Sequence, residues 1–191
     1  MSGMNIEKLL DGTVVIPAVR TPADFEYALL HARSTTLILL FGDINSLPAQ
    51  LAQAQKYHKR LFIHLDLLEG VGRDKAGIRF LARLGVTGII TTKNQLVKTA
   101  RDEGMIVIQR LFVMDSEALR HGVQLLKSGK PDAVEVLPAS VPEETIKLIT
   151  NETKLPVLAG GLLSTEAQVK LSLANGTVAV STSKKELWAV K

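Results

Sequence analysis

Residues 157–183 read VLAGGLLSTEAQVKLSLANGTVAVSTS, and this stretch contains the repeating unit of the whole chain. One apolar run ends in Gly160-Gly161, and a second ends in Ser181-Thr182-Ser183. Between them, Ser164 supplies a hydroxyl that can cap a helix start, and Gly176 stands where that helix would stop. The stretch therefore predicts a strand, a helix and a second strand parallel to the first.

The same unit recurs along the rest of the chain. Apolar runs begin at intervals of 18 to 27 residues, near Val14, Leu37, Phe62, Gly88, Ile106, Ala133, Val157 and Val178. Their apolar residues are consecutive, which is typical of strands buried on both faces. The segments between them carry helix-start signals in Thr21-Pro22-Ala23-Asp24 and at Asp115, and helix-stop signals at Gly104 and Gly129.

Repeated strand–helix units in 191 residues predict an α/β fold, a compact (β/α)8 TIM-like barrel that forms a single domain over residues 1–191. An open doubly wound sheet is the alternative. It is weakened because Val19-Arg20-Thr21-Pro22 follows the first strand, where a dinucleotide-binding sheet carries a glycine-rich turn.

The composition excludes several classes of protein. The chain has no cysteine, which excludes disulfides, thiolate metal sites and a cysteine nucleophile. Its net charge of +4 permits an anionic partner without requiring one, and its aromatic content of 4% disfavours RNA recognition on an aromatic-rich sheet. Residues 1–7 lack the pattern of a secretion signal, and no apolar run approaches the roughly 20 residues of a membrane span. We expect a soluble cytoplasmic protein with no membrane partner.

Function in such a barrel lies at the carboxyl ends of the strands, where polar residues gather in this sequence. The candidate ligand-binding residues there are Arg20, Asp66, Lys93, Arg110, Glu135, Gly160, Gly161, Ser181, Thr182 and Ser183.

The loops after strands seven and eight of barrels often bind phosphate together with a short helix, because glycines let backbone N–H groups approach an oxyanion. Ser183-Lys184-Lys185-Glu186 reads as the capping box of such a helix. The alternative is that Gly160-Gly161 is only a tight turn and the serines only cap a helix. The position of both segments in the strand count favours a phosphate site.

A His-x-Asp pair closes the third run, where a two-residue period places His64 and Asp66 on the inner face. The pair could bind a metal or run acid–base chemistry, but the other histidines fall in helical stretches. We therefore expect a hydrogen-bonded polar layer, no metal and no cofactor, and whether the pair also contacts the ligand stays open. The glycine-containing loop that follows, with Arg73 and Lys75, reads as a mobile lid.

Two further charged features have competing interpretations. Glu135 lies inside a strand and needs a partner, which Arg110 at the end of the neighbouring strand can supply as a structural pair or as part of a ligand site. The run Lys56-Tyr57-His58-Lys59-Arg60 is more readily explained as solvation of a helix C-terminus than as a nucleic-acid surface.

Several phrases together carry a resemblance that runs in order over nearly the whole chain. They are Val15-Ile16-Pro17-Ala18-Val19-Arg20, His64-Leu65-Asp66-Leu67-Leu68-Glu69-Gly70, Gln109-Arg110-Leu111-Phe112, Val134-Glu135-Val136-Leu137-Pro138, Ala159-Gly160-Gly161-Leu162, and Ser181-Thr182-Ser183 through Leu187-Trp188. The sequence resembles the bacterial glycerol-3-phosphate-responsive antiterminators, the glycerol uptake operon antiterminator regulatory proteins. It departs from that pattern at Thr91-Thr92-Lys93 and at Ala139, without losing a charged group.

The resemblance implies a TIM-barrel-like regulator, not an enzyme, that senses glycerol 3-phosphate and binds the leader mRNA of a glycerol utilisation operon to prevent premature termination. Arg73, Lys75, Lys184 and Lys185 are the cations expected to contact RNA. The oligomeric state stays open, a homo-oligomer included.

Two enzyme classes remain as alternatives. A phosphosugar-type TIM-barrel enzyme would use Asp66 or Glu135 as a base, with Lys93 as electrophile or phosphate partner. The second alternative, a glycerophosphodiester hydrolase, is disfavoured because its chemistry would require more carboxylates and a second catalytic histidine at the strand ends.

Overall fold

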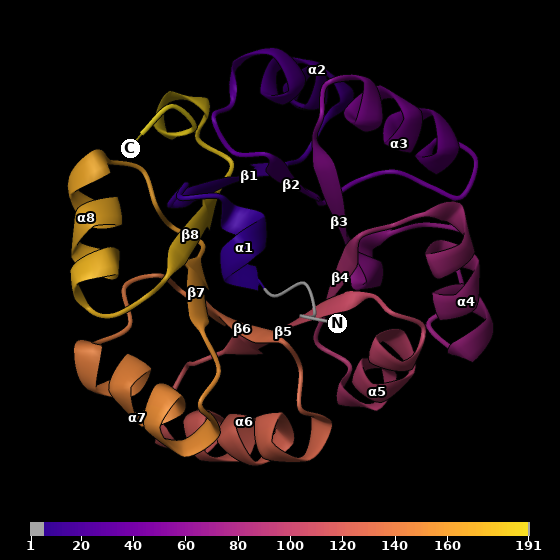
Figure 1. The fold of residues 1–191 in the computed structure, drawn as a ribbon. Coiled ribbons are helices and arrows are strands. Elements are labelled where there is room, and N and C mark those ends of the chain that lie inside the picture. The colour runs from indigo at the N-terminus through magenta and orange to yellow at the C-terminus, as the bar shows by residue number, and fades with distance from the viewer. Residues whose placement is uncertain (1–5, 191) are drawn as a thin grey trace.

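The computed structural model describes residues 6–190, and its strands close into a barrel (Figure 1). Each strand pairs in parallel with the next, and the last pairs with the first. The strands are β1 (Val15–Val19), β2 (Thr36–Leu39), β3 (Arg60–His64), β4 (Gly88–Thr91), β5 (Ile106–Phe112), β6 (Ala133–Leu137), β7 (Val157–Gly160) and β8 (Ala179–Thr182). The predicted (β/α)8 barrel in a single α/β domain is confirmed, and the alternative prediction of an open doubly wound sheet is wrong.

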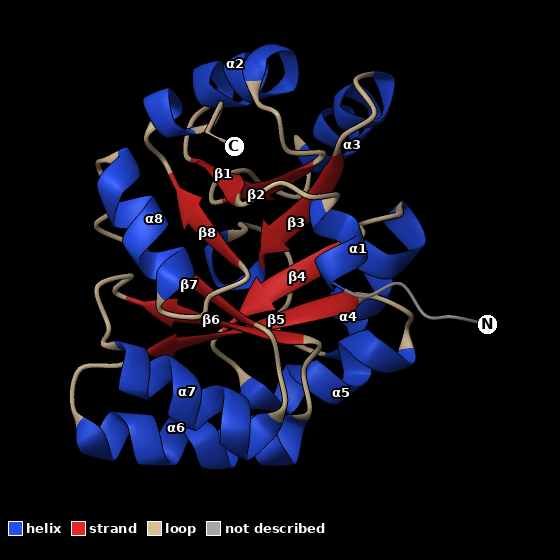
Figure 2. Cartoon of the chain, turned by 60° about the vertical axis from the view of Figure 1, so that its left-hand side comes forward, coloured by secondary structure: helices blue, strands red, loops and turns tan. Residues whose placement is uncertain are grey.

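Helices surround the strands on the outside of the barrel (Figures 1 and 2). They are α2 (Pro22–His31), α3 (Leu47–Lys56), α4 (Lys75–Leu84), α5 (Asn94–Asp102), α6 (Ser116–Gly129), α7 (Glu143–Thr153) and α8 (Glu166–Ala174), with the 3₁₀ turns η1 (Leu65–Leu67) and η2 (Lys185–Leu187). Within residues 6–190, no helix is both long enough and apolar enough to cross a bilayer.

Most of the predicted helix ends are confirmed. The side chains of Thr21 and Asp115 accept hydrogen bonds from backbone N–H groups in the first turns of α2 and α6. The start predicted at Ser164 lies one residue later, because Thr165 caps α8 and forms a capping box with Gln168.

The capping box predicted for residues 183–186 is wrong. The segment forms only the short turn η2, and its first flanking residue, Lys184, makes no side-chain cap. The N–H of Lys184 is instead satisfied by the hydroxyl of Thr182, at 3.1 Å. The chain end therefore contributes no regular helix to the strand ends.

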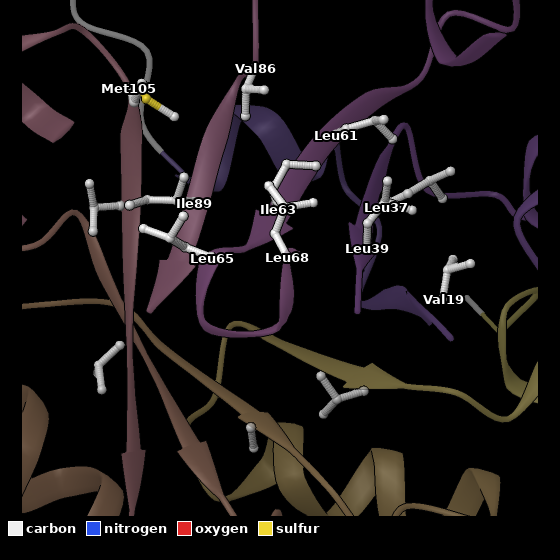
Figure 3. Packing of buried hydrophobic residues seen from close by; sticks show 14 of the residues in the cluster. Val19, Leu37, Leu39, Leu61, Ile63, Leu65, Leu68, Val86, Ile89 and Met105 are labelled. Carbon is white, nitrogen blue, oxygen red and sulfur yellow. The ribbon is translucent and has the colours of Figure 1, made fainter. Parts of the chain in front are cut away.

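Successive residues of each strand point alternately outward and inward, so the barrel has two cores. The outward residues pack against the surrounding helices, as Figure 3 shows for Leu37, Leu39, Leu61 and Ile63 among others. The inward residues form a second cluster, which includes Ile38 of β2, between the outward Leu37 and Leu39. This alternation explains the consecutive apolar residues that marked the strands in the sequence.

A short helix that the strand pattern did not predict, α1 (Ile6–Leu10), lies within the ring of strands (Figure 1). Its residues Ile6, Leu9 and Leu10 are buried in the inner cluster. The hydroxyl of Thr36, at the start of β2, donates a 3.0 Å hydrogen bond to the Leu9 carbonyl. The helix therefore fills the N-terminal end of the barrel interior.

Candidate ligand site at the C-terminal ends of the strands

The inward-facing residues change from apolar to polar toward the C-terminal ends of the strands. Isoleucines occupy inward positions nearer the strand starts, and the polar inward residues beyond them are His64, Arg110, Glu135 and Ser181. The register brings several of them together, because Arg110 lies opposite Glu135, and Gly160 opposite Ser181. The barrel thus presents a polar layer above its apolar interior.

A cavity of about 430 Å³ opens above this layer. Its wall contains the predicted residues Arg20, Arg110, Gly161, Ser181, Thr182, Ser183 and Lys184. Its remaining lining, which sequence reasoning did not identify, is Ala18, Leu40, Leu137, Leu162, Leu163 and Ser164. Most of these are apolar residues at strand ends, where no polar side chain marked them as part of a site.

A buried ion pair forms the floor of the cavity. The Nε of Arg110 donates to Oε2 of Glu135 at 2.7 Å, and the hydroxyl of Ser181 donates to Oε1 at 2.5 Å. The Glu135 side chain is 1% exposed and that of Arg110 is 11% exposed. The predicted pairing is confirmed. Because Arg110 uses Nε for this bond and also lines the cavity, its terminal amino groups remain available to an anion.

Gly160 lies beneath the cavity and makes this arrangement sterically feasible. A Cβ atom there would lie 2.6 Å from the hydroxyl of Ser181 and 2.9 Å from Oε1 of Glu135. Gly160 and Glu135, both predicted to bind ligand, therefore support the cavity from below instead of lining it.

The wall formed after β7 and β8 carries the predicted phosphate residues. Gly161 has a φ of +78°, a conformation that glycine adopts without strain. The hydroxyl of Thr182 donates to the carbonyl of Leu163 at 3.2 Å and so ties the two segments together. Ser183 and Lys184 are exposed and have no side-chain partner among residues 6–190. Arg20, Arg110 and Lys184 all line the cavity, so its cations outnumber the one carboxylate, Glu135, that pairs with Arg110 beneath it.

Asp66 lies outside the cavity wall. The third strand ends at His64, and Asp66 falls in η1, so the two-residue period does not continue to it. Both of its carboxylate oxygens accept hydrogen bonds of 2.8 Å from Thr91 and Thr92. Burial raises the pKa of Asp66, but these hydrogen bonds outweigh burial and hold the pKa below its ordinary value. The structure thus makes Asp66 a brace between the ends of β3 and β4.

His64 belongs to the polar layer. Its side chain is buried, and neither ring nitrogen has a hydrogen-bond partner. Burial, assisted by the positive charge of Arg110, lowers the pKa of His64 to about 4, so its imidazole is neutral at pH 7. Across residues 6–190, no three His, Cys, Asp or Glu side chains gather closely enough to hold a metal ion.

The loop predicted to be a mobile lid is held by specific contacts. The N–H of Ile44 donates to the carbonyl of Glu69 at 3.0 Å, and the N–H of Glu69 donates to the carbonyl of Gly42 at 3.1 Å. Arg73 donates to the carbonyl of Asp66 at 2.6 Å. These contacts fix the loop against the segment that follows β2.

The cations expected to contact RNA do not gather into one group. Arg73 and Lys75 follow β3, whereas Lys184 and Lys185 follow β8, and β1 and β2 lie between those strands. Lys185 forms a 2.7 Å ion pair with Asp24, and Arg73 is engaged with Asp66. Lys93, expected at the ligand, lies after β4 and is absent from the cavity wall.

Comparisons with known proteins point to one family. The family model described as "Glycerol-3-phosphate responsive antiterminator" matches residues 15–188. A glycerol uptake operon antiterminator regulatory protein from Listeria monocytogenes str. 4b F2365 superposes with a TM-score of 0.88 at 35% identity, covering 94% of this chain and 97% of that one. A glycerol uptake operon antiterminator-related protein from Thermotoga maritima MSB8 has a TM-score of 0.82 at 28% identity, covering 92% and 97%.

Two other matches add less about function. YgcP of Escherichia coli (strain K12), an uncharacterized protein, is 31% identical over 188 residues, which are 98% of this chain and 97% of that protein. An HpcH/HpaI aldolase from Desulfitobacterium hafniense DCB-2 has a TM-score of 0.70 at 11% identity, covering 97% and 92%, and shows the fold alone. The family match over nearly the whole barrel and the cationic cavity agree, and the chain belongs to the glycerol-3-phosphate responsive antiterminator family.

Proposed function

We propose that this chain senses glycerol 3-phosphate in the cavity at the strand ends and, when liganded, binds the leader mRNA of a glycerol utilisation operon in the cytoplasm. The observation that carries the ligand half is the state of Arg110. Its guanidinium is tethered to Glu135 through Nε, and it faces the cavity beside Arg20 and Lys184. Cations that line a small cavity, one of them held in place by a buried carboxylate, are suited to a phosphate monoester.

Within this proposal, the phosphate lies against Gly161, Ser183 and Lys184, with the terminal amino groups of Arg110 turned toward it. The cavity of about 430 Å³ has the size typical of small-ligand sites and excludes large nucleotides from complete burial.

The hydrogen bonds made by Glu135 and Asp66 favour a ligand receptor over a phosphosugar-type enzyme. Both oxygens of Glu135 are engaged by Arg110 and Ser181, and both oxygens of Asp66 are engaged by threonines. A general base needs a carboxylate within reach of the substrate and able to take its proton. Since these two groups are committed to structural partners, we propose that the ligand is bound without turnover.

The test compares thermal unfolding with glycerol 3-phosphate, glycerol and inorganic phosphate. At a hundred times its dissociation constant, glycerol 3-phosphate should add about 2.7 kcal/mol, or roughly 5–11 °C for a chain of this size. Lys184→Ala should reduce the shift. Its neighbour Lys185 is outside the cavity wall, so Lys185→Ala serves as the matched control and should keep the shift.

Equal shifts with glycerol and its phosphate would contradict the ligand assignment. Long incubation of glycerol 3-phosphate with the protein, monitored by NMR, tests for turnover. Release of free phosphate or formation of an isomer would favour the enzyme alternative. The RNA half is tested by selecting RNA from a random library with and without glycerol 3-phosphate, and ligand-dependent enrichment is expected.

A further inference from the structure

Two turns at the N-terminal end of the barrel, opposite the cavity, lie side by side. The ammonium of Lys59, after α3, donates 2.7 Å hydrogen bonds to the carbonyls of Ala32 and Ser34, after α2. The N–H of Arg60 donates to the carbonyl of Thr35 at 2.7 Å. Cations from both turns therefore share one surface, which we call the N-terminal basic surface: Arg33, Lys56, Lys59 and Arg60.

Acids are few at this surface, where Glu26 of α2 lines a groove together with Lys56. Between Glu26 and Asp66 the sequence contains one acidic residue, Asp43, and it follows β2 at the opposite end of the barrel. Asp11 lies on the turn after α1, which reaches the edge of the surface through a 3.4 Å contact between the hydroxyls of Thr13 and Ser34. Within the described chain, none of the four cations of the surface forms an ion pair.

Some other cations at helix ends are neutralised, whereas Arg83 and Lys130 form no ion pair within the described residues. Arg101, at the end of α5, pairs with Asp132 at 3.2 Å, and Lys127 of α6 pairs with Glu152 of α7 at 2.5 Å. The N-terminal basic surface differs from these isolated helix-end cations because it gathers four cations from two adjoining turns.

The basic run at residues 56–60 has two interpretations, solvation of a helix C-terminus and a nucleic-acid surface, and the contacts of Lys59 distinguish them. Lys59 serves a helix end directly, because the carbonyl of Ala32 at the C-cap of α2 accepts its ammonium hydrogen bond. Arg33, Lys56 and Arg60 are exposed, and no helix carbonyl among residues 6–190 accepts a hydrogen bond from their side chains. Arg60 donates one 3.3 Å hydrogen bond to the hydroxyl of Thr35 and keeps its charge unpaired. Helix-end solvation therefore explains one of the four cations and leaves three for another partner.

An exposed aromatic ring accompanies these cations. Tyr57 is 39% exposed and stands between Lys56 and His58. It borders a groove of about 330 Å³ between α2 and α3, which are neighbours in Figure 1. The groove is lined by Glu26, Leu29, Leu30, Gln53, Lys56 and Tyr57. Cations that track a phosphate backbone and an aromatic ring on which a base can stack are the two elements of single-stranded nucleic-acid binding.

We propose that the N-terminal basic surface binds a single-stranded segment of RNA, with Arg33, Lys56 and Arg60 at phosphates and Tyr57 stacked on a base. The identity of the partner rests on the proposed function, whereas the location rests on the geometry above. The RNA then lies about 15 Å from the ligand, across strands of four to five residues that rise about 3.3 Å each. The cations near the C-terminal ends of the strands are then not the principal contacts of the RNA: Arg73, Lys75, Lys184 and Lys185.

The experiment measures binding of a 3′-fluorescein-labelled, random-sequence 30-nucleotide RNA by anisotropy, in the presence of 10 mM glycerol 3-phosphate and between 50 and 300 mM KCl. The test variant is Arg33→Gln/Lys56→Gln/Arg60→Gln, which spares Lys59 because that residue holds the two turns together. The matched control is Arg83→Gln/Lys98→Gln/Lys130→Gln, which removes the same charge from exposed residues on other elements. Far-UV circular dichroism and thermal unfolding establish that each variant is folded.

We expect the test variant to lose roughly tenfold or more in affinity at the lowest salt. The slope of log affinity against log salt should also flatten by about 2, since each phosphate contact with a single strand contributes about 0.7. The matched control should stay within threefold of the parent at every salt concentration. Tyr57→Leu should weaken binding about fivefold or more and leave the salt slope unchanged, because stacking releases no counterions.

Two results would overturn the proposal in distinguishable ways. If the parent binds the RNA and the test variant binds equally well, the location is wrong while the proposed function stands. Loss of binding in Lys75→Gln/Lys184→Gln instead would place the RNA at the mouth. If the parent binds no RNA even at 50 mM KCl, the RNA half of the proposed function fails together with this surface.

Discussion

The indole Nε1 of Trp188 donates a 2.8 Å hydrogen bond to the carbonyl of Thr182, a residue of the cavity wall. The carbonyl of Trp188 in turn accepts the N–H of Arg33 at 3.3 Å. One buried side chain and its backbone therefore join the ligand cavity to the N-terminal basic surface. Such chains of packed side chains and hydrogen bonds can carry coupling between two sites.

Replacing Trp188 tests whether this path carries a signal. Saturating glycerol 3-phosphate should raise the affinity of the parent for RNA roughly 5–150-fold, the usual range of allosteric coupling. Trp188→Phe removes the indole N–H and should reduce that factor below about two, with each ligand still bound when offered alone. The measurement is RNA anisotropy with and without 10 mM glycerol 3-phosphate. An unchanged factor in the variant would show that coupling takes another route.

Arg110→Ala should destabilise the unliganded protein by about 3–5 kcal/mol, because it leaves the carboxylate of Glu135 buried without its cation. The double variant Arg110→Ala/Glu135→Gln should recover most of that loss. Urea unfolding of all the variants provides the free energies.

The matched control for this pair is Arg79→Ala. Arg79 uses the same Nε atom for a 2.9 Å bond to Glu103, but its side chain is 58% exposed. Its loss should cost less than about 1 kcal/mol. Additive losses in the Arg110 and Glu135 variants would contradict the coupling between those two residues.

His64 predicts a pH dependence of stability. Folding lowers its pKa from 6.5 to about 4, so the unfolded chain binds a proton that the folded chain refuses between those values. The contribution of neutral His64 to the free energy of unfolding is therefore complete above pH 6.5. As pH falls toward 4, roughly 3 kcal/mol of that free energy is lost. His64→Leu should flatten this part of the curve of unfolding free energy against pH. Parallel curves for parent and His64→Leu would refute the assignment.

Gly161 and Gly104 offer a comparison of matched backbone positions. Their φ angles are +78° and +80°, but only Gly161 lines the cavity. Leucine at either position should cost about 1–2 kcal/mol for the left-handed conformation. Only Gly161→Leu should abolish the thermal shift produced by glycerol 3-phosphate. A full shift in Gly161→Leu would remove this glycine from the proposed phosphate site.

The strands were predictable because each is apolar on two faces and the connecting segments are nearly equal in length. The predicted run at Phe62 and the observed β3 from Arg60, for example, differ by two residues. Helix α1 was not predictable in the same way. Five residues carry too little periodicity to indicate a helix, and α1 is stabilised by the inner core into which Ile6 and Leu9 are buried.

The candidate site was predictable where it depends on neighbouring strands in register. The pairing of Arg110 with Glu135 follows from the barrel, since β5 and β6 are adjacent. Asp66 was assigned to the inner face wrongly, because the chain leaves the strand at His64 and turns toward β4. Long-range contacts such as the ion pair of Lys185 with Asp24 join the two ends of the chain, and no local pattern announces them.

Helix α1 closes one end of the barrel interior, and this bears on how a complex of protein, ligand and RNA can come apart. The ligand can enter and leave only through the C-terminal mouth, because Ile6, Leu9 and Leu10 fill the other end. RNA on the proposed surface leaves that mouth uncovered. The ligand can then leave without prior release of the RNA, so a fall in metabolite concentration reaches the protein while it is still on the transcript. The regulator would report current supply instead of the supply at the moment when it first bound.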